Sequence, residues 1–425
     1  MKNNLNKKHG YLLAGLISSL MASNMTMAAI DVTDKSTLGF EGYIRTGLGV
    51  SKDGEGLVEF TAPGAGSNYR LGNEADTNLE MAFNYRQFFD ASKDPSDPSV
   101  QAYLMLDGYT VHDSGIDITL DHVAQAYISF DNFVGDGTKV WVGRRYYDRQ
   151  ITYMTDHFWL NTAQNSQAGA GIENLKFAGG DFSAALIHGE DNRDGYAVDS
   201  MGLDFRLKNL AVNDGGSLNL WAYYNVRPED EIAGLDSESG YGFGVWHTQS
   251  LFDGKGSNTV RALYREGTAV PQHAFTPNPL MNNGTTEDID TFELATDLVF
   301  SASEDVDVGF TALYRETDET TLGNTVSTKW YSVGVRPQIA VTDHLSWVFD
   351  LGYDRVDNGI TDAGVTKTAA AFQIGAGKGY WARPVVRFFG TYAFWDDEFK
   401  GQVGGDTYAD DTDGWTAGIQ AEWWW

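Results

Sequence analysis

The chain has 425 residues, with 48 glycines, 13% aromatic residues, 9 prolines and no cysteine. Its formal net charge of −29 argues against nucleic acid or an anionic membrane surface as a partner, because like charges repel. The lack of cysteine excludes disulfides and thiolate chemistry, so secondary structure and packing must stabilise the fold. Abundant glycine and aromatic residues favour short strands joined by tight turns.

The first 29 residues are predicted to be a signal peptide. Lys2, Lys7 and Lys8 precede the apolar run 11–21, and small residues ending in 28–29 supply a signal-peptidase site. The run is too short to cross a bilayer as a helix, which needs about 20 residues. Removing this segment removes three basic residues and no acidic residue, so the net charge falls from −29 to −32. Residues 30–425 are therefore predicted to be an exported chain with a single domain.

Alternation of apolar and polar residues with a period of two predicts strands along the mature chain. The pattern is clear in four stretches, at residues 38–48, 79–86, 218–225 and 415–425. Clusters of Gly, Asp and Asn indicate turns or loops between strands, as at residues 53–56, 191–195, 282–284 and 410–414. The chain has no sustained helical stripe and no clear short repeat. Strands of roughly 10 residues with their turns allow about 16 to 18 strands.

This alternation fits either a soluble sandwich with a wet outer face or a membrane barrel with a wet interior. The last strand ends with an aromatic residue on its apolar face, Trp425, which resembles the end of bacterial outer-membrane barrels. Aromatic residues also gather at strand ends, at 146–147 and 423–425, where amphipathic rings suit a membrane interface. The signal peptide, the acidic charge and the lack of cysteine agree with export to that membrane. The predicted fold class is all-β, a transmembrane antiparallel β-barrel of the Gram-negative outer membrane.

Several stretches go beyond composition. In chain order they are GYIRTG (42–47), YRLGNE (69–74), WVGRRYYDR (141–149), GAGIEN (169–174), HTQS (247–250), KWYSVGVRP (329–337), WARP (381–384) and TYAFWD (391–396). Each is weak alone, but the ordered set covers nearly the whole mature chain and resembles the maltoporin family of outer-membrane sugar porins.

The resemblance implies an 18-stranded barrel, a homotrimer and a constriction made by an inward-folded third loop. It also implies passive diffusion of sugars, foremost maltose and maltodextrins, along an aromatic slide and a polar track. Sugars have apolar C–H faces that pack on aromatic rings, and hydroxyl groups that need hydrogen-bond partners in a narrow passage. The expected partners are an oligosaccharide, outer-membrane lipid and further copies of the chain. No cofactor, metal, nucleic acid or enzymatic activity is expected.

The resemblance places Tyr43, Trp381 and Trp424 on the sugar slide. Strand parity independently assigns Tyr43 and Trp424 to polar faces, where an aromatic ring is not needed to meet lipid. Packing against an inward loop is the alternative explanation for such rings. The resemblance places seven further residues on the polar track or at the constriction: Arg45, Arg70, Glu80, Arg149, Asp156, Phe158 in place of a tyrosine, and His122 in place of an arginine.

The chain departs from the family pattern at several positions. One slide position holds Asn78 and another falls near Lys255, so neither is aromatic. Ile151 stands where the family has an acid. The second loop lacks the tryptophan that the family lends to a neighbouring subunit, and Tyr109 is a candidate substitute. These losses keep open a second hypothesis, a general or differently specific diffusion pore.

Other chemistries receive little support. The 59 acidic residues will form pairs by chance, so no spacing marks a glycosidase carboxylate pair. The eight histidines show no HExxH spacing. Residues 190–195 and 410–413 resemble calcium loops only faintly and are expected to be solvated turns. A secreted sandwich enzyme or carbohydrate-binding protein is the third hypothesis, and solubility without detergent would favour it.

Overall fold

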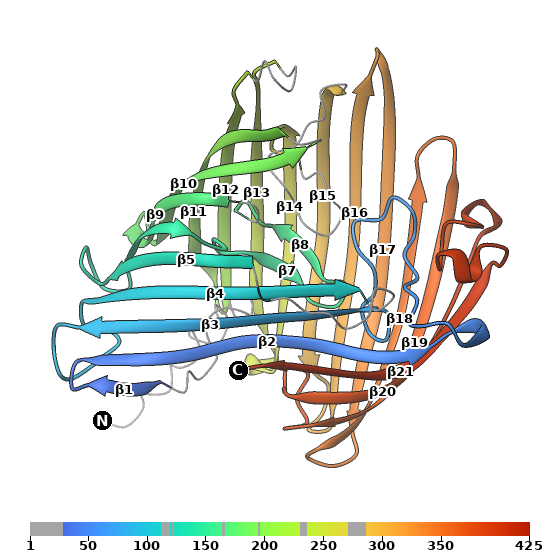
Figure 1. The fold of residues 1–425 in the computed structure, drawn as a ribbon, viewed down its shortest axis with the longest axis horizontal. Coiled ribbons are helices and arrows are strands. Elements are labelled where there is room, and N and C mark those ends of the chain that lie inside the picture. The colour runs from blue at the N-terminus through green and yellow to red at the C-terminus, as the bar shows by residue number, and fades with distance from the viewer. Residues whose placement is uncertain are drawn as a thin grey trace.

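A computed structural model describes residues 29–111, 120, 122–163, 166–193, 196–229, 236–270 and 286–425. Eighteen antiparallel strands form one ring, which closes where β2 pairs with both β3 and β21 (Figure 1). The predicted 18-stranded all-β barrel is therefore confirmed. Within the described residues, no helix is long and apolar enough to cross a membrane. Residues 1–28 of the predicted signal peptide and the cluster at 282–284 lie outside the described residues.

The strands of the ring are, in pairing order, β2 (Ser36–Val50), β3 (Asp76–Phe88), β4 (Ser99–Val111), β5 (His122–Asp131), β6 (Lys139–Arg144), β9 (Ser166–Phe177), β10 (Gly180–Arg193), β11 (Tyr196–Asn213), β12 (Gly216–Arg227), β13 (Glu238–Leu251), β14 (Gly256–Gly267), β15 (Thr286–Ser301), β16 (Val306–Thr321), β17 (Asn324–Ala340), β18 (Leu345–Asp357), β19 (Asp362–Gly375), β20 (Val385–Trp395) and β21 (Asp413–Trp424). The remaining elements are β1 (Ile30–Thr33), the inner hairpin β7 (Gln150–Thr152) and β8 (His157–Leu160), and the 3-10 turns η1 (Lys52–Gly54), η3 (Phe252–Gly254), η4 (Asp397–Phe399) and η5 (Asp406–Tyr408).

The period-two pattern separates the two faces of the ring as predicted. The outward side chains of Phe40, Phe83 and Ile419 are 39%, 41% and 39% exposed. Inward positions on the same strands are polar and buried, as at Arg45 and Glu422. A closed ring leaves no strand edge unpaired, so its backbone groups are satisfied without water. The apolar outer face therefore suits lipid and the polar inner face suits a lumen.

The two ends of the chain close the ring side by side. Gly42 and Trp425 exchange two backbone hydrogen bonds of 3.1 Å. A Cβ atom at Gly42 would lie 2.3 Å from the Trp425 ring, so glycine allows this close approach. The Trp425 ring lies 5.4 Å from Phe40 on the outer face, centroid to centroid, as parity predicted. The short strand β1 pairs with the start of β2, beyond the point where β21 ends.

The inner segment 51–75, between β2 and β3, lies inside the ring against β17 and β18 (Figure 1). Tyr69 forms a hydrogen bond of 2.9 Å with the hydroxyl of Ser332. Its ring crosses Gly334 and Gly352, where an added Cβ would lie 2.1 and 2.0 Å from ring atoms. The segment is therefore fixed to the far wall by packing that only glycine permits.

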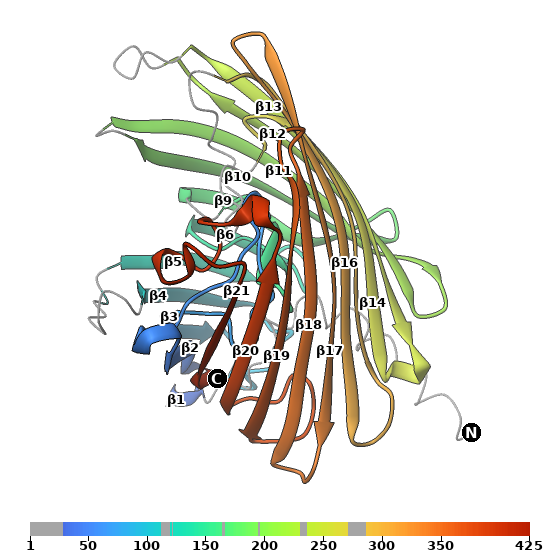
Figure 2. The same cartoon turned by 90° about the vertical axis from the view of Figure 1, so that its right-hand side faces the viewer.

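Loop 396–412, drawn in red, folds back beside β20 and β21 (Figure 2). From this loop Tyr408 packs on Phe60 of the inner segment 51–75, with ring centroids 5.6 Å apart. Trp395, at the end of β20, lies 5.9 Å from the same phenylalanine. Loop 396–412 therefore packs against the inner segment 51–75 and helps to hold it in place.

The inner segment 145–163 contains the hairpin β7–β8 and packs on the wall formed by β12 to β15. Trp159 lies 5.4 Å from Trp246, and both rings are buried. His157 Nε2 lies 3.0 Å from a carboxylate oxygen of Glu293 on β15. Burial lowers the pKa of His157 to about 4, although Glu293 opposes this shift. The third loop is therefore folded inward, as the resemblance implied.

A third inner segment, the turn 376–384 between β19 and β20, enters from the other end of the ring. Tyr380 is buried, and its backbone N–H donates to Asp307 at 2.8 Å. Its ring lies against Gly309 of β16, where an added Cβ would be 2.7 Å from the hydroxyl. The single inward loop implied by the resemblance is therefore joined by two further inner segments.

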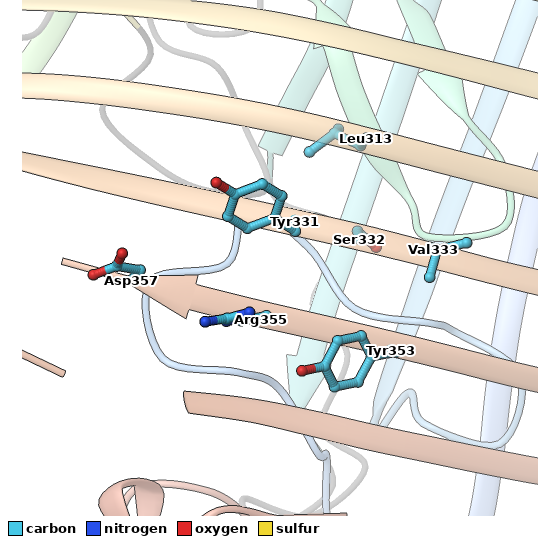
Figure 3. A pocket seen from close by; sticks show the side chains of 7 residues that line it. All are labelled: Leu313, Tyr331, Ser332, Val333, Tyr353, Arg355 and Asp357. Carbon is cyan, nitrogen blue, oxygen red and sulfur yellow. The ribbon is translucent and has the colours of Figure 1, made fainter. Parts of the chain in front are cut away.

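The outer wall carries a shallow hollow between β17 and β18 (Figure 3). Tyr331 and Tyr353 form its sides, and Arg355 and Asp357 also line it. Both tyrosine rings point outward and are about two-fifths exposed, at 42% and 39%. The hollow therefore belongs to the outer face and is not part of the lumen.

Candidate functional site

Five aromatic side chains lie together inside the ring, and we call them the aromatic group: Tyr43, Tyr153, Tyr380, Trp381 and Trp424. Tyr43 and Trp424 are cross-strand partners on β2 and β21. The ring of Tyr153, from the inner segment 145–163, lies 5.1 Å from Trp381 and 6.1 Å from Trp424. Tyr380 and Trp381 pack edge to face at 4.9 Å. The three residues predicted for the slide are thus arranged around Tyr153, which the sequence did not single out.

Two guanidinium groups lie on these rings. The Arg70 guanidinium carbon is 4.5 Å from the centre of the Tyr153 ring. That of Arg383 is 5.5 Å from Tyr153 and 4.4 Å from Trp424. Burial alone would lower the pKa of Arg70, but the Glu74 and Glu422 carboxylates raise it well above its ordinary value. Both cations therefore stay charged and stabilise the rings through cation–π contacts.

The predicted polar-track residues Arg45, Arg70 and Asp156 belong to one ion-pair network. Arg45 binds Asp76 in a bidentate pair, with distances of 2.9 and 2.6 Å. Its third nitrogen lies 2.7 Å from Glu74 and 3.6 Å from Asp156. Glu74 also accepts a bond of 2.6 Å from Arg70. Because the network joins β2, the inner segment 51–75 and the inner segment 145–163, it ties both inner segments to the wall of the ring.

Arg149 and Phe158 lie together on the inner segment 145–163. The Arg149 guanidinium carbon is 3.9 Å from the Tyr146 ring centre and 5.1 Å from that of Phe158. Among the described residues, no carboxylate lies within 4.0 Å of it in the way that acids pair with the other track arginines. All three side chains are partly exposed. Arg149 therefore presents a positive charge to the lumen.

Glu80 and His122 also lie on the lumen face. Glu80 is the cross-strand partner of Tyr43, so the two side chains share a face. The pairing of β4 with β5 shifts between Met105 and Leu106, and this bulge brings His122 opposite Asp107. His122 Nε2 lies 2.9 Å from an Arg144 nitrogen. An arginine is therefore adjacent to the position where the resemblance expected one.

The family departures have distinct structural settings. Asn78 on β3 is the cross-strand partner of Tyr109 on β4. The Tyr109 side chain is 63% exposed, and it shares the lumen face with Asn78. Lys255 lies in the exposed turn between β13 and β14. Ile151 lies on the inner hairpin, partly buried.

The structure adds Tyr153, Tyr380 and Glu422 to the predicted residues. Tyr153 and Tyr380 lie in irregular inner segments, where alternation carries no signal. Glu422 lies on the predicted polar face of the last strand, so parity could have found it. Among the described residues, no group of three or more histidine, aspartate and glutamate side chains is arranged to hold a metal ion.

Three solved structures of low sequence identity are similar to this chain. The anion-selective porin from Comamonas acidovorans is 11% identical, with a TM-score of 0.46 over 92% of this chain and 100% of that one. Salmonella typhi OmpF in complex with daunomycin is 10% identical, with a TM-score of 0.47 over 93% and 100% of the two chains. Acinetobacter baumannii OccAB1 is 11% identical, with a TM-score of 0.47 over 91% and 96%.

One family of proteins accounts for nearly the whole chain. The family model described as LamB porin matches residues 38–425, from the third residue of β2 to the residue after β21. This range contains the ring, the three inner segments and the aromatic group. The chain belongs to the LamB porin family and is an outer-membrane β-barrel porin.

Proposed function

We propose that this porin passes linear sugars, foremost maltodextrins, by passive diffusion over the aromatic group. The observation that carries the proposal is the gathering of Tyr43, Trp381 and Trp424 around Tyr153 on the polar side of the ring. Rings in this position have no lipid to meet. Flat rings can stack on the C–H faces of a sugar, and the sugar loses few hydrogen bonds to water when it stacks in this way.

The charged groups beside the rings supply partners for sugar hydroxyls. Arg149 and Asp156 are partly exposed on the inner segment 145–163, and Glu80 is partly exposed on the strand beside Tyr43. In a narrow passage a hydroxyl that loses water needs such partners. Binding has to be weak and repeated along the path, so that a sugar leaves as readily as it enters. We further propose a homotrimer whose first 29 residues are removed on export.

The decisive experiment is ion-current recording on the purified, detergent-extracted protein in planar bilayers. Maltose, longer maltodextrins, sucrose and a β-linked oligosaccharide are titrated in turn. We expect reversible block whose strength rises with the length of the maltodextrin, because a longer chain covers more rings. Conductance that no maltodextrin changes would overturn the sugar assignment and leave the porin in place.

A general diffusion pore is the second candidate. It is favoured by Asn78, which stands at a slide position without an aromatic ring. In that case sucrose, maltose and the β-linked sugar would reduce the current only through viscosity, and to the same extent.

A further inference from the structure

One buried carboxylate in the lumen, that of Glu422, accepts hydrogen bonds from five side chains. Its side chain is fully buried. Three donors are guanidinium groups, of Arg70 at 2.9 Å, Arg383 at 2.8 Å and Arg387 at 3.0 Å. The other two are phenol hydroxyls, of Tyr153 at 2.8 Å and Tyr43 at 3.2 Å.

These donors come from five separate parts of the chain. Arg70 belongs to the inner segment 51–75, Tyr153 to the segment 145–163 and Arg383 to the turn 376–384. Arg387 lies on β20 and Tyr43 on β2. All three inner segments therefore meet at the Glu422 carboxylate, as does the seam where the ring closes.

The charge of Glu422 keeps like charges together. Three guanidinium groups surround one carboxylate, and the side chains of these four residues are at most 10% exposed. Weak screening inside the protein makes both their attraction to the carboxylate and their mutual repulsion strong. Without the negative charge, the cations would move apart toward water. Glu74 would still pair with Arg70 at 2.6 Å, so Arg383, which has no second carboxylate partner among the described residues, would move furthest and leave the face of Trp424.

We propose that Glu422 is a positioning residue for sugar recognition, which rests on the proposed function. It holds Arg383 on one face of Trp424, so sugar can stack only on the other face. It also holds the Tyr153 ring beside the Arg70 guanidinium by accepting the bond from the Tyr153 hydroxyl, to which Arg383 also donates. Glu422 does not touch the sugar. Its ion pairs with Arg383 and Arg387 also keep these two positive charges out of the ion path.

Glu293 provides a matched control for a purely structural role. It is also fully buried and accepts bonds from Arg261 at 2.9 Å and Arg315 at 2.7 Å. It also lies 3.0 Å from His157, so it ties the same inner segment 145–163 to β15, away from the cluster at Glu422. If Glu422 only held that segment in place, loss of either carboxylate would have the same effect on sugar binding.

The test compares Glu422→Gln, Glu293→Gln and Tyr153→Phe in planar bilayers, with maltohexaose as the probe. We expect Glu422→Gln to weaken the block about tenfold and to shift the reversal potential in a KCl gradient toward anion selectivity. Glu293→Gln should stay within about twofold of the unmodified porin in both. Tyr153→Phe keeps the ring and loses the hydrogen bonds of its hydroxyl with Glu422 and Arg383, so a block weakened about threefold is expected.

Several outcomes would overturn the positioning role. One is an unchanged block constant in Glu422→Gln, and another is an equal loss in Glu422→Gln and Glu293→Gln. If Glu422→Gln does not assemble, Tyr153→Phe decides, and an unchanged block in that variant overturns the proposal. Absence of block in the unmodified porin would instead overturn the proposed function, so the two failures are distinguishable.

Discussion

Replacement of Trp424 by alanine tests the aromatic group directly. One face of the ring is already covered by Arg383 at 4.4 Å, so a sugar can gain one stacking face at this position. Loss of one such contact costs about 1 kcal/mol, which corresponds to roughly a fivefold weaker block by maltohexaose. Open-channel conductance should be unchanged or higher, because a side chain that borders the lumen becomes smaller.

Trp423 is the natural control because it is the same residue type one position away. Its ring points to the outer face and is 44% exposed, beside Trp425. Trp423→Ala should therefore leave the block constant within about 1.5-fold, an estimate for a site that meets no sugar. Titration of both variants in the same bilayer lipid gives the comparison. Equal losses in the two variants, or no loss in Trp424→Ala, would refute the assignment of the ring to the sugar path.

Three further changes test other parts of the structure. Arg149→Gln removes a lumen cation that has no close carboxylate among the described residues, so the reversal potential should shift toward cation selectivity. An unchanged potential would place Arg149 outside the ion path. His157 has a pKa of about 4, below its ordinary value, so the unfolded chain takes up this proton first as the pH falls. The stability of the folded porin should therefore decline as the pH falls from about 6.5 to about 4. Melting temperatures at pH 7 and pH 4.5 should show a smaller decline for His157→Gln than for the unmodified porin. An identical decline in both would contradict a buried, neutral His157. Gly42→Ala brings a Cβ to within 2.3 Å of the Trp425 ring and should lower the temperature at which the folded porin denatures in detergent, whereas Gly390→Ala meets nothing within 4 Å and should be neutral.

The strands could be predicted from the sequence because each depends on a local pattern. Lipid outside and polar groups inside impose the period of two on every strand, and the face of each residue follows from its parity. Phe40 and Phe83 point outward and Arg45 inward, as that rule predicts. The bulge in β5 is an exception, because one extra residue changes parity and brings His122 opposite Asp107. The lumen position of His122 came from the resemblance and not from alternation.

The candidate site could be predicted only in part. Tyr43, Trp424 and Arg45 lie on strands, so their lumen positions follow from parity. Tyr153 and Tyr380 lie on inner segments whose course is set by contacts far away in sequence, such as that of Tyr380 with Gly309. Local patterns do not encode those contacts. The sequence therefore could not predict that three inner segments meet at the Glu422 carboxylate.

Parity also cannot separate rings that meet the lumen from rings that pack beneath an inner segment. Trp221 lies on the polar face of β12, just as Trp424 lies on that of β21. Trp221 is nevertheless buried in a cluster with Trp159 of the inner segment 145–163, whereas Trp424 remains partly exposed. Both explanations for an aromatic ring on a polar face are thus present in one molecule. The course of the inner segments decides which one applies, so the same strand pattern can support pores of different selectivity when those segments change.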